Sequence, residues 1–155
     1  MRDTKKAFDW ITSLLDELGH RYVVVGGLAT NVYGGVRPLN DIDLDVPKAA
    51  LKEVAERAKE WLVFGPARYR DEQFDIELLS LCFAGQDIDL TAAEDIRLFD
   101  RQAGAWCNLP TDLDASEPHE VLGKVVAVMK RELLIGYKKM IARRTDLEDI
   151  AAMEG

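Results

Sequence analysis

The sequence predicts an α/β fold of the α+β type, in which helices flank a mixed sheet and a helical part follows it. Strand-like and helix-like segments alternate in the first half of the chain, two more strand-like segments follow as a pair, and the C-terminal segment has helical periodicity. The chain has 155 residues, the size of one ordinary domain. We therefore expect a single domain over residues 1–155, with the sheet core at about 20–91 and the helical part at about 116–155.

The first half is predicted to alternate helices with strands. Apolar residues recur at helical spacing from Thr4 to Leu18, and Gly19 is a typical helix stop. After it we expect a buried strand at 21–25, a short helix at 28–35, a strand at 39–46 and a helix from Pro47 to about Leu62.

The second half is predicted to be a strand pair followed by helices. We expect a loop at 64–73, antiparallel strands at 74–83 and 87–91, and a second loop at 108–118. Thr91 and Glu94 have the spacing of a capping box, which predicts a helix toward Gln102. Helices are expected from Ser116 onward, with a break at Gly136.

The composition is that of a protein with a substantial core and a charged surface. Apolar residues make up 48% of the chain, and no apolar run approaches the roughly 20 residues that span a bilayer, so we expect no membrane association. The polar start has no secretory pattern, and Cys82 and Cys107 make no disulfide framework, so we expect a cytoplasmic protein that buries both thiols. The net charge of −8 argues against binding to duplex DNA.

Two segments place carboxylates on one face of a strand. Asp41, Asp43 and Asp45 share a face, as do Asp87 and Asp89, because successive side chains of a strand point to opposite sides. Like charges on one face repel one another, and Mg²⁺ would offset this because it takes oxygen ligands and bridges to phosphates. If the two strands are neighbours, three carboxylates converge as in two-metal sites. The alternative is a solvated acidic face.

Gly26 and Gly27 lie where a strand ends and a short helix begins. Glycine lets backbone N–H groups approach a ligand closely, so this turn is a candidate cradle for a triphosphate; the alternative is a tight turn without a ligand. The glycine spacing fits neither the dinucleotide fingerprint nor the P-loop. The residues after Asp41 do not fit a calcium loop, and the presence of only two histidines argues against a zinc site.

The strand, the two glycines, the short helix and the Asp-x-Asp strand together resemble the DNA polymerase β-like nucleotidyltransferase superfamily. The stretch VVGGLATNVYGGVRPLNDIDL is similar to its small bacterial members, including those related to abortive-infection toxin–antitoxin nucleotidyltransferases. The third carboxylate of the superfamily lies between apolar residues on a later strand, and Asp89 matches it better than Asp87. Small members often end in a lysine followed by R-x-x-D-x-x-D. Residues that fit this ending are Arg143, Asp146 and Asp149, with Lys124 or Lys130 as the lysine.

The resemblance implies a nucleotidyltransferase fold and the transfer of a nucleoside monophosphate from a nucleoside triphosphate to an acceptor hydroxyl with Mg²⁺ or Mn²⁺. Asp41, Asp43 and Asp89 would ligate the metals, and Asp89 would also act as general base. Gly26 and Gly27 would position the β and γ phosphates. Arg37 and Lys124 are further candidate nucleotide ligands, although Arg37 would equally suit a structural role, and Asp146 and Asp149 either pair within the helices or touch the nucleotide.

The resemblance leaves activity and acceptor open. Leu39 and Thr145 stand where many members have threonine and lysine, which favours the alternative of a catalytically silent nucleotide-binding or antitoxin-like module. The acceptor is a small molecule, an RNA end or a protein side chain, and a partner protein would fit a toxin–antitoxin role.

Overall fold

The computed structural model describes the whole chain, Met1–Gly155, and is built around one mixed sheet. Its eight strands follow the order β3-β4-β5-β2-β1-β8-β7, with β6 paired to β5 beside this path. The strands are β1 (Val23–Val25), β2 (Asp41–Val46), β3 (Leu62–Arg70), β4 (Phe74–Phe83), β5 (Gln86–Asp100), β6 (Ala105–Asn108), β7 (Ser116–Val121) and β8 (Lys124–Met129). The β2–β5 and β1–β8 pairs are parallel and the others antiparallel, which confirms the predicted mixed sheet.

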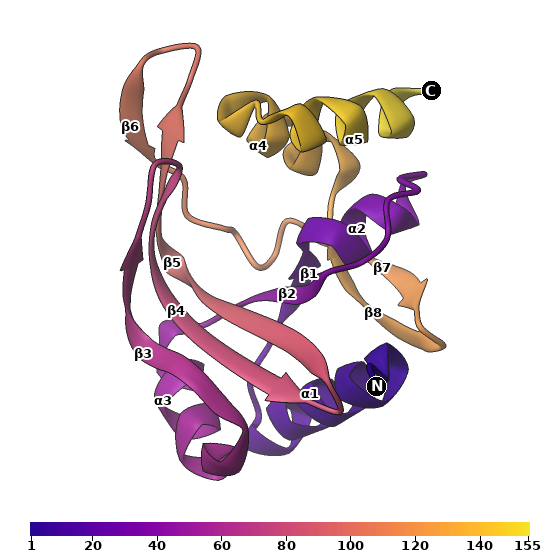
Figure 1. Cartoon of the computed structure of the whole chain (residues 1–155), viewed down its shortest axis with the longest axis vertical. Coiled ribbons are helices and arrows are strands. Elements are labelled where there is room, and N and C mark those ends of the chain that lie inside the picture. The colour runs from indigo at the N-terminus through magenta and orange to yellow at the C-terminus, as the bar shows by residue number, and fades with distance from the viewer.

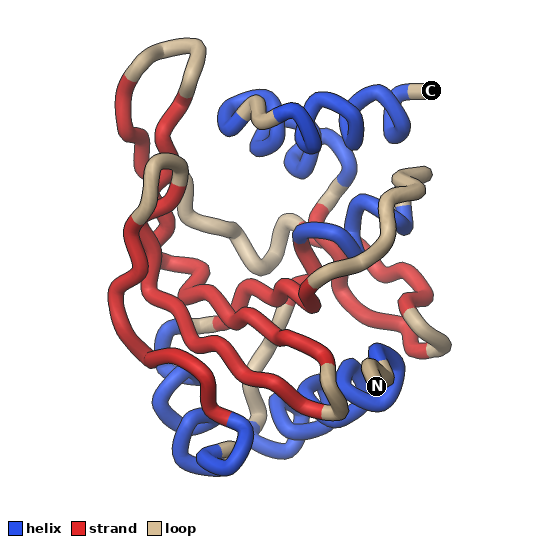
Figure 2. Tube along the Cα trace, in the orientation of Figure 1, coloured by secondary structure: helices blue, strands red, loops and turns tan.

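Helices cover both faces of this sheet (Figures 1 and 2). They are α1 (Thr4–Leu18), α2 (Gly26–Val32), α3 (Lys48–Arg57), α4 (Arg131–Ile141) and α5 (Arg144–Glu154), with a short 3₁₀ turn at Lys59–Trp61. In Figure 1, α1 and α3 lie together below the sheet, whereas α2, α4 and α5 lie above it. None of these helices combines the length and the apolar character needed to cross a membrane.

The main core lies between the sheet and the layer formed by α1 and α3. Ile42 and Leu44 of β2 and Ile88 and Leu90 of β5 are fully buried and belong to one cluster with the apolar faces of both helices. These residues alternate with aspartates along both strands, so the carboxylates emerge on the opposite face of the sheet. The core therefore turns the acidic face of β2 and β5 toward α4 and α5.

The predicted limits of α1 are confirmed. Asp3 caps its start by accepting a hydrogen bond from the backbone N–H of Lys6. Gly19 ends it in the left-handed conformation, with φ of 77°.

The segment predicted as a loop at 64–73 lies mostly within β3. This edge strand pairs with β4 through irregular register around Gly65 and Pro66, in keeping with a sequence that lacks a regular strand pattern. The predicted helix from Pro47 to about Leu62 is shorter than expected, because α3 ends at Arg57 and the 3₁₀ turn leads directly into β3.

The helix predicted from Thr91 toward Gln102 is wrong. Strand β5 continues to Asp100 and pairs with β4 and then with β6. Glu94 does cap a helix, but a different one: its carboxylate accepts a hydrogen bond from the backbone N–H of Lys48 at the start of α3.

The helical part begins later than the predicted residue 116. Residues 116–129 contain the hairpin β7–β8, and the sheet therefore extends beyond the expected limit of 91. Helix α4 runs through Gly136, and the break falls instead at Ala142, whose φ is 51°. Cys82 and Cys107 are free thiols and half-buried, not fully buried as expected.

Candidate functional site

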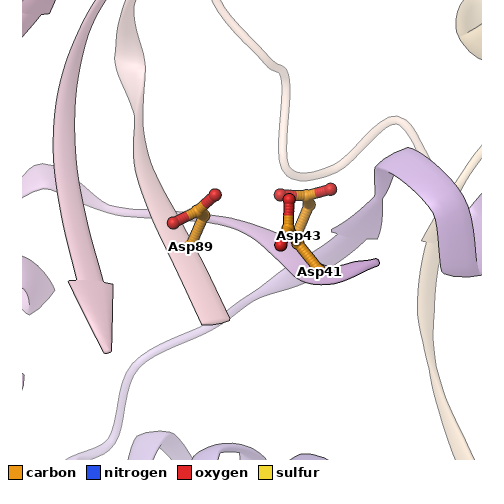
Figure 3. Close-up of side chains that lie close together, drawn as sticks. All are labelled: Asp41, Asp43 and Asp89. Atoms are coloured by element: carbon orange, nitrogen blue, oxygen red, sulfur yellow. The ribbon is translucent and has the colours of Figure 1, made fainter. Parts of the chain in front are cut away.

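Three carboxylates converge at the centre of the sheet. Strands β2 and β5 are parallel and in register, so Asp41 lies opposite Asp87 and Asp43 opposite Asp89. Asp41, Asp43 and Asp89 each offer an oxygen atom, and these atoms lie within 4.8 Å of one another (Figure 3). The convergence predicted from the alternation of both segments is therefore present.

The electrostatics of this cluster disfavour its ionised form. Burial raises the pKa of Asp43 to about 8, and the charges of Asp89, Asp41 and Asp45 add to the effect. Burial and Asp87 raise the pKa of Asp41 as well. A group of carboxylates that resists ionisation becomes stable as anions when a cation joins it.

Asp89 is oriented by a second side chain. The hydroxyl of Ser80 on β4 donates a hydrogen bond of 2.6 Å to Asp89 Oδ1. Burial raises the pKa of Asp89, the bond from Ser80 lowers it, and the charges of Asp41 and Asp87 raise it further. Ser80 was not predicted, although its position opposite Asp89 follows from the pairing of β4 with β5.

Asp45 and Asp87 share the acidic face but lie outside the group of three. Asp45 is buried and accepts a hydrogen bond of 2.6 Å from the hydroxyl of Thr111. Burial raises its pKa to about 6, and the bond from Thr111 lowers it. Asp87 is exposed. The group of three therefore contains Asp89 and not Asp87.

Gly26 and Gly27 form the turn beside the carboxylates. Gly26 has a φ of +61°, and a Cβ built on it would collide with the carboxylate of Asp43. A Cβ on Gly27 would lie 2.9 Å from Leu39 Cδ1. Glycine at both positions lets the backbone approach Asp43 and the loop that precedes β2.

The carboxylates and the two glycines line one cavity of about 680 Å³, a size typical of small-molecule sites. Residues of β2, β4 and β5 line it on the sheet side, and residues of α4 and α5 line it on the helix side. On the β4 side the lining is apolar and aromatic: Tyr69, Phe74, Ile76, Leu78 and Tyr137. The cavity therefore has an acidic centre, a glycine-rich side and an apolar side.

An ion-pair network ties the wall of this cavity to the C-terminal helices. Arg37 donates two hydrogen bonds to Asp149, of 2.7 Å and 2.8 Å. Lys138 of α4, which is only 5% exposed, contacts Asp149 at 3.0 Å and Asp146 at 3.5 Å. Burial alone would raise the pKa of Asp149. The hydrogen bonds and charges of Arg37 and Lys138 favour its anion, and the pKa is lowered as a result. Arg143 completes the network by pairing with Asp146, with which it caps α5.

The structure does not bring Lys124 to the cavity. Lys124 begins β8, and its ammonium donates to Thr12 and Asp16 of α1, below the sheet. The lysine in the cavity is Lys138, which the sequence analysis missed. The signal was available, because Leu134, Lys138 and Ile141 lie on one buried helical face, where an unpaired lysine would be costly.

The three carboxylates suit a hard divalent cation. Mg²⁺ and Mn²⁺ prefer oxygen ligands, and adjacent ligands around an octahedral Mg²⁺ lie about 3 Å apart. The three oxygens lie within 4.8 Å of one another, so the side chains would draw together around an ion. Asp41, Asp43 and Asp89 are therefore the residues that would hold such an ion.

Comparison of the structure with solved proteins gives a consistent result. A candidate nucleotidyltransferase from Thermotoga maritima has a TM-score of 0.68 and 19% identity, covering 97% of this chain and 93% of its own. The lincosamide antibiotic adenylyltransferase LnuA, bound to lincomycin, has a TM-score of 0.63 and 14% identity, covering 100% of this chain and 99% of its own. An antigenic nucleotidyltransferase-like protein from Paracoccidioides brasiliensis has a TM-score of 0.55 and 19% identity, covering 96% and 74% respectively. No protein-family model and no curated protein matches the sequence. The chain therefore has the nucleotidyltransferase fold.

Proposed function

We propose that this protein transfers a nucleoside monophosphate from a nucleoside triphosphate to an acceptor hydroxyl, with Mg²⁺ or Mn²⁺. The observation that supports this most strongly is the convergence of Asp41, Asp43 and Asp89 beside the Gly26–Gly27 turn. The fold it shares with nucleotidyltransferases makes this chemistry the best match to the geometry.

In this proposal Asp41, Asp43 and Asp89 would hold divalent metal ions, which would supply positive charge to neutralise the phosphates. Asp89 also accepts the proton of the acceptor hydroxyl. The acceptor oxygen forms a bond to the α-phosphorus, the bond between the α-phosphorus and the bridging oxygen breaks, and pyrophosphate leaves. Ser80 donates a hydrogen bond to Asp89 Oδ1 and thereby fixes the orientation of this carboxylate.

The backbone of Gly26 and Gly27 is proposed to hold the β and γ phosphates. Arg37 lines the same side of the cavity, and Asp149 binds its Nε and Nη2 atoms. This orientation leaves Arg37 Nη1 to contact a phosphate oxygen. Arg37 would then combine the nucleotide-binding and structural roles that the sequence left open.

The apolar side of the cavity favours a small acceptor. Attacking and leaving oxygens lie roughly in line in phosphoryl transfer, so an acceptor would lie opposite the glycine turn, on the β4 side. That wall carries Phe74, Ile76 and Leu78, and α4 covers it. We therefore propose a hydroxylated small molecule with an apolar body, and lincomycin, the ligand bound to LnuA, is a suitable first probe.

Label transfer from each α-³²P-labelled nucleoside triphosphate tests the proposal, with lincomycin, RNA and protein fractions as acceptors. Asp89→Asn should lower the rate by about 10²–10⁴ through loss of the base alone. Asp87→Asn is the matched control, because Asp87 lies on the same strand face outside the group of three. If Asp87→Asn abolishes transfer and Asp89→Asn does not, the assignment of the third carboxylate is wrong. Metal-dependent nucleotide binding without transfer to any acceptor would favour the silent-module alternative.

A further inference from the structure

The geometry of the carboxylates depends on a parallel strand pair that no turn connects. In a hairpin the turn fixes which residues face each other, but β2 and β5 are joined only through other elements. The buried alternation of both strands excludes a slip of one residue, but a slip of two residues would keep that alternation and place Asp43 opposite Asp87 or Thr91 instead of Asp89. Some contact must therefore fix the register of these two strands.

Gln86 makes contacts of this kind at the start of both strands. Its side chain is fully buried, and its Nε2 atom donates to the carbonyl of Asn40 at 2.8 Å and to that of Asp87 at 2.9 Å. Asn40 directly precedes Asp41, so one amide group joins the beginning of β2 to the beginning of β5. Its Oε1 atom accepts a hydrogen bond of 2.6 Å from the hydroxyl of Thr4 on α1.

The N-terminal segment adds a second contact at the same place. Arg2 donates a hydrogen bond of 2.7 Å to the carbonyl of Leu39, the residue before Asn40. The two carbonyls that lead into Asp41 are therefore both held by side chains from other parts of the chain. Of the two residues that make these contacts, Gln86 is the buried one. Its Nε2 and Oε1 atoms both take part in hydrogen bonds.

We propose that Gln86 is a positioning residue, which holds β2 and β5 in register and thereby sets the separation of the Asp41, Asp43 and Asp89 carboxylates. The inference rests on the proposed function, since the purpose of that separation is to hold a divalent cation. Gln86 does not itself face the cavity. It acts through the backbone at either side of the cluster.

Gln86→Leu tests this role, because leucine fills the space but makes none of the three hydrogen bonds. Mn²⁺ binding to the full chain, followed by electron paramagnetic resonance, should weaken by about 10-fold to 100-fold, as for other residues that orient metal ligands. Val54→Ala is the matched control: Val54 is fully buried in the same core, but on α3 and away from the carboxylates. Its Mn²⁺ affinity should equal that of the wild type even if its stability is lower.

Thr4→Val provides a milder variant that also covers the case in which Gln86→Leu does not fold. It removes only the bond that anchors Gln86 Oε1, so a smaller loss of Mn²⁺ affinity in the same direction is expected. Wild-type affinity in Gln86→Leu, or in Thr4→Val if the first variant is unfolded, would overturn the inference.

A crystal structure of the variant separates this inference from the proposed function. If the wild type binds no Mn²⁺, the proposed metal site fails, but the position of the carboxylates in the variant still decides the role of Gln86. Oxygens that remain within the wild-type limit of 4.8 Å would overturn it, and oxygens that have moved apart would support it.

Discussion

Replacing Asp43 by asparagine should stabilise the metal-free protein. Burial and the neighbouring carboxylates raise the pKa of Asp43 from 3.8 to about 8. Between these pH values the folded state binds more protons than the unfolded state, so stability falls as the pH rises through this window. Asparagine carries no charge and avoids this loss.

The size of the gain follows from the pKa change. At 1.36 kcal/mol per pK unit, a rise from 3.8 to about 8 corresponds to roughly 6 kcal/mol above pH 8. Solvent reaches the half-buried carboxylate and reduces the expected gain to about 2 kcal/mol. For a chain of this size, that raises the melting temperature by about 4–8 °C.

Thermal unfolding of both proteins in EDTA at pH 4, 6 and 8 measures this effect. The difference between Asp43→Asn and the wild type should be near zero at pH 4 and largest at pH 8. Asp87→Asn, at an exposed position of the same acidic face, should show little difference at any pH. With Mn²⁺ at about 100 times its Kd, the wild type alone should gain about 2.7 kcal/mol. A variant that is less stable than the wild type at pH 8 in EDTA would refute the reasoning.

Two further substitutions and one removal test other parts of the site. Gly26→Ala should abolish nucleotide binding in a calorimetric titration, because the new Cβ collides with Asp43. Gly19 has a similar φ but open space around it, so Gly19→Ala should keep nucleotide binding. Asp149→Asn should lower the free energy of unfolding in urea by about 3 kcal/mol, because it leaves Lys138 buried with a weaker partner; a change under 0.5 kcal/mol would show that the network contributes little. Chelation of divalent metal should clearly weaken binding of a nucleoside triphosphate, and equal affinity in EDTA and Mg²⁺ would contradict the metal site.

Sequence could predict an element of the fold where its pattern of apolar and polar residues fits only one kind of secondary structure. Alternation in DIDLD and DIDLT indicated strands, and it correctly placed Asp43 and Asp89 on faces that meet. Their pairing was a hypothesis, because strand adjacency is set by tertiary contacts. Glu94 shows the opposite case: its spacing from Thr91 suggested a local cap, but its partner, Lys48, is distant in sequence.

The errors at 64–73 and 116–129 have related causes. Gly65 and Pro66 usually mark turns, yet an edge strand tolerates them because one side of its backbone is unpaired. The β7 sequence, SEPHEV, also contains a proline and lies at the other edge of the sheet. The β-branched run in β8 could have indicated a strand. The lysine spacing pointed to Lys124 or Lys130, whereas the helical spacing of Lys138 with Leu134 and Ile141 was the signal that Lys138 faces inward.

The strand order also has a kinetic consequence. The β4–β5 hairpin joins neighbouring segments, whereas β2–β5 and β1–β8 join segments that are far apart in sequence and must close large loops. Asp43, Asp89 and Lys138 come together only after these distant segments have met. A nucleotide that binds in the cavity these residues line would recognise only the completed fold, so it should slow unfolding markedly while leaving the rate of refolding almost unchanged. The ligand would thus report on the last step of assembly.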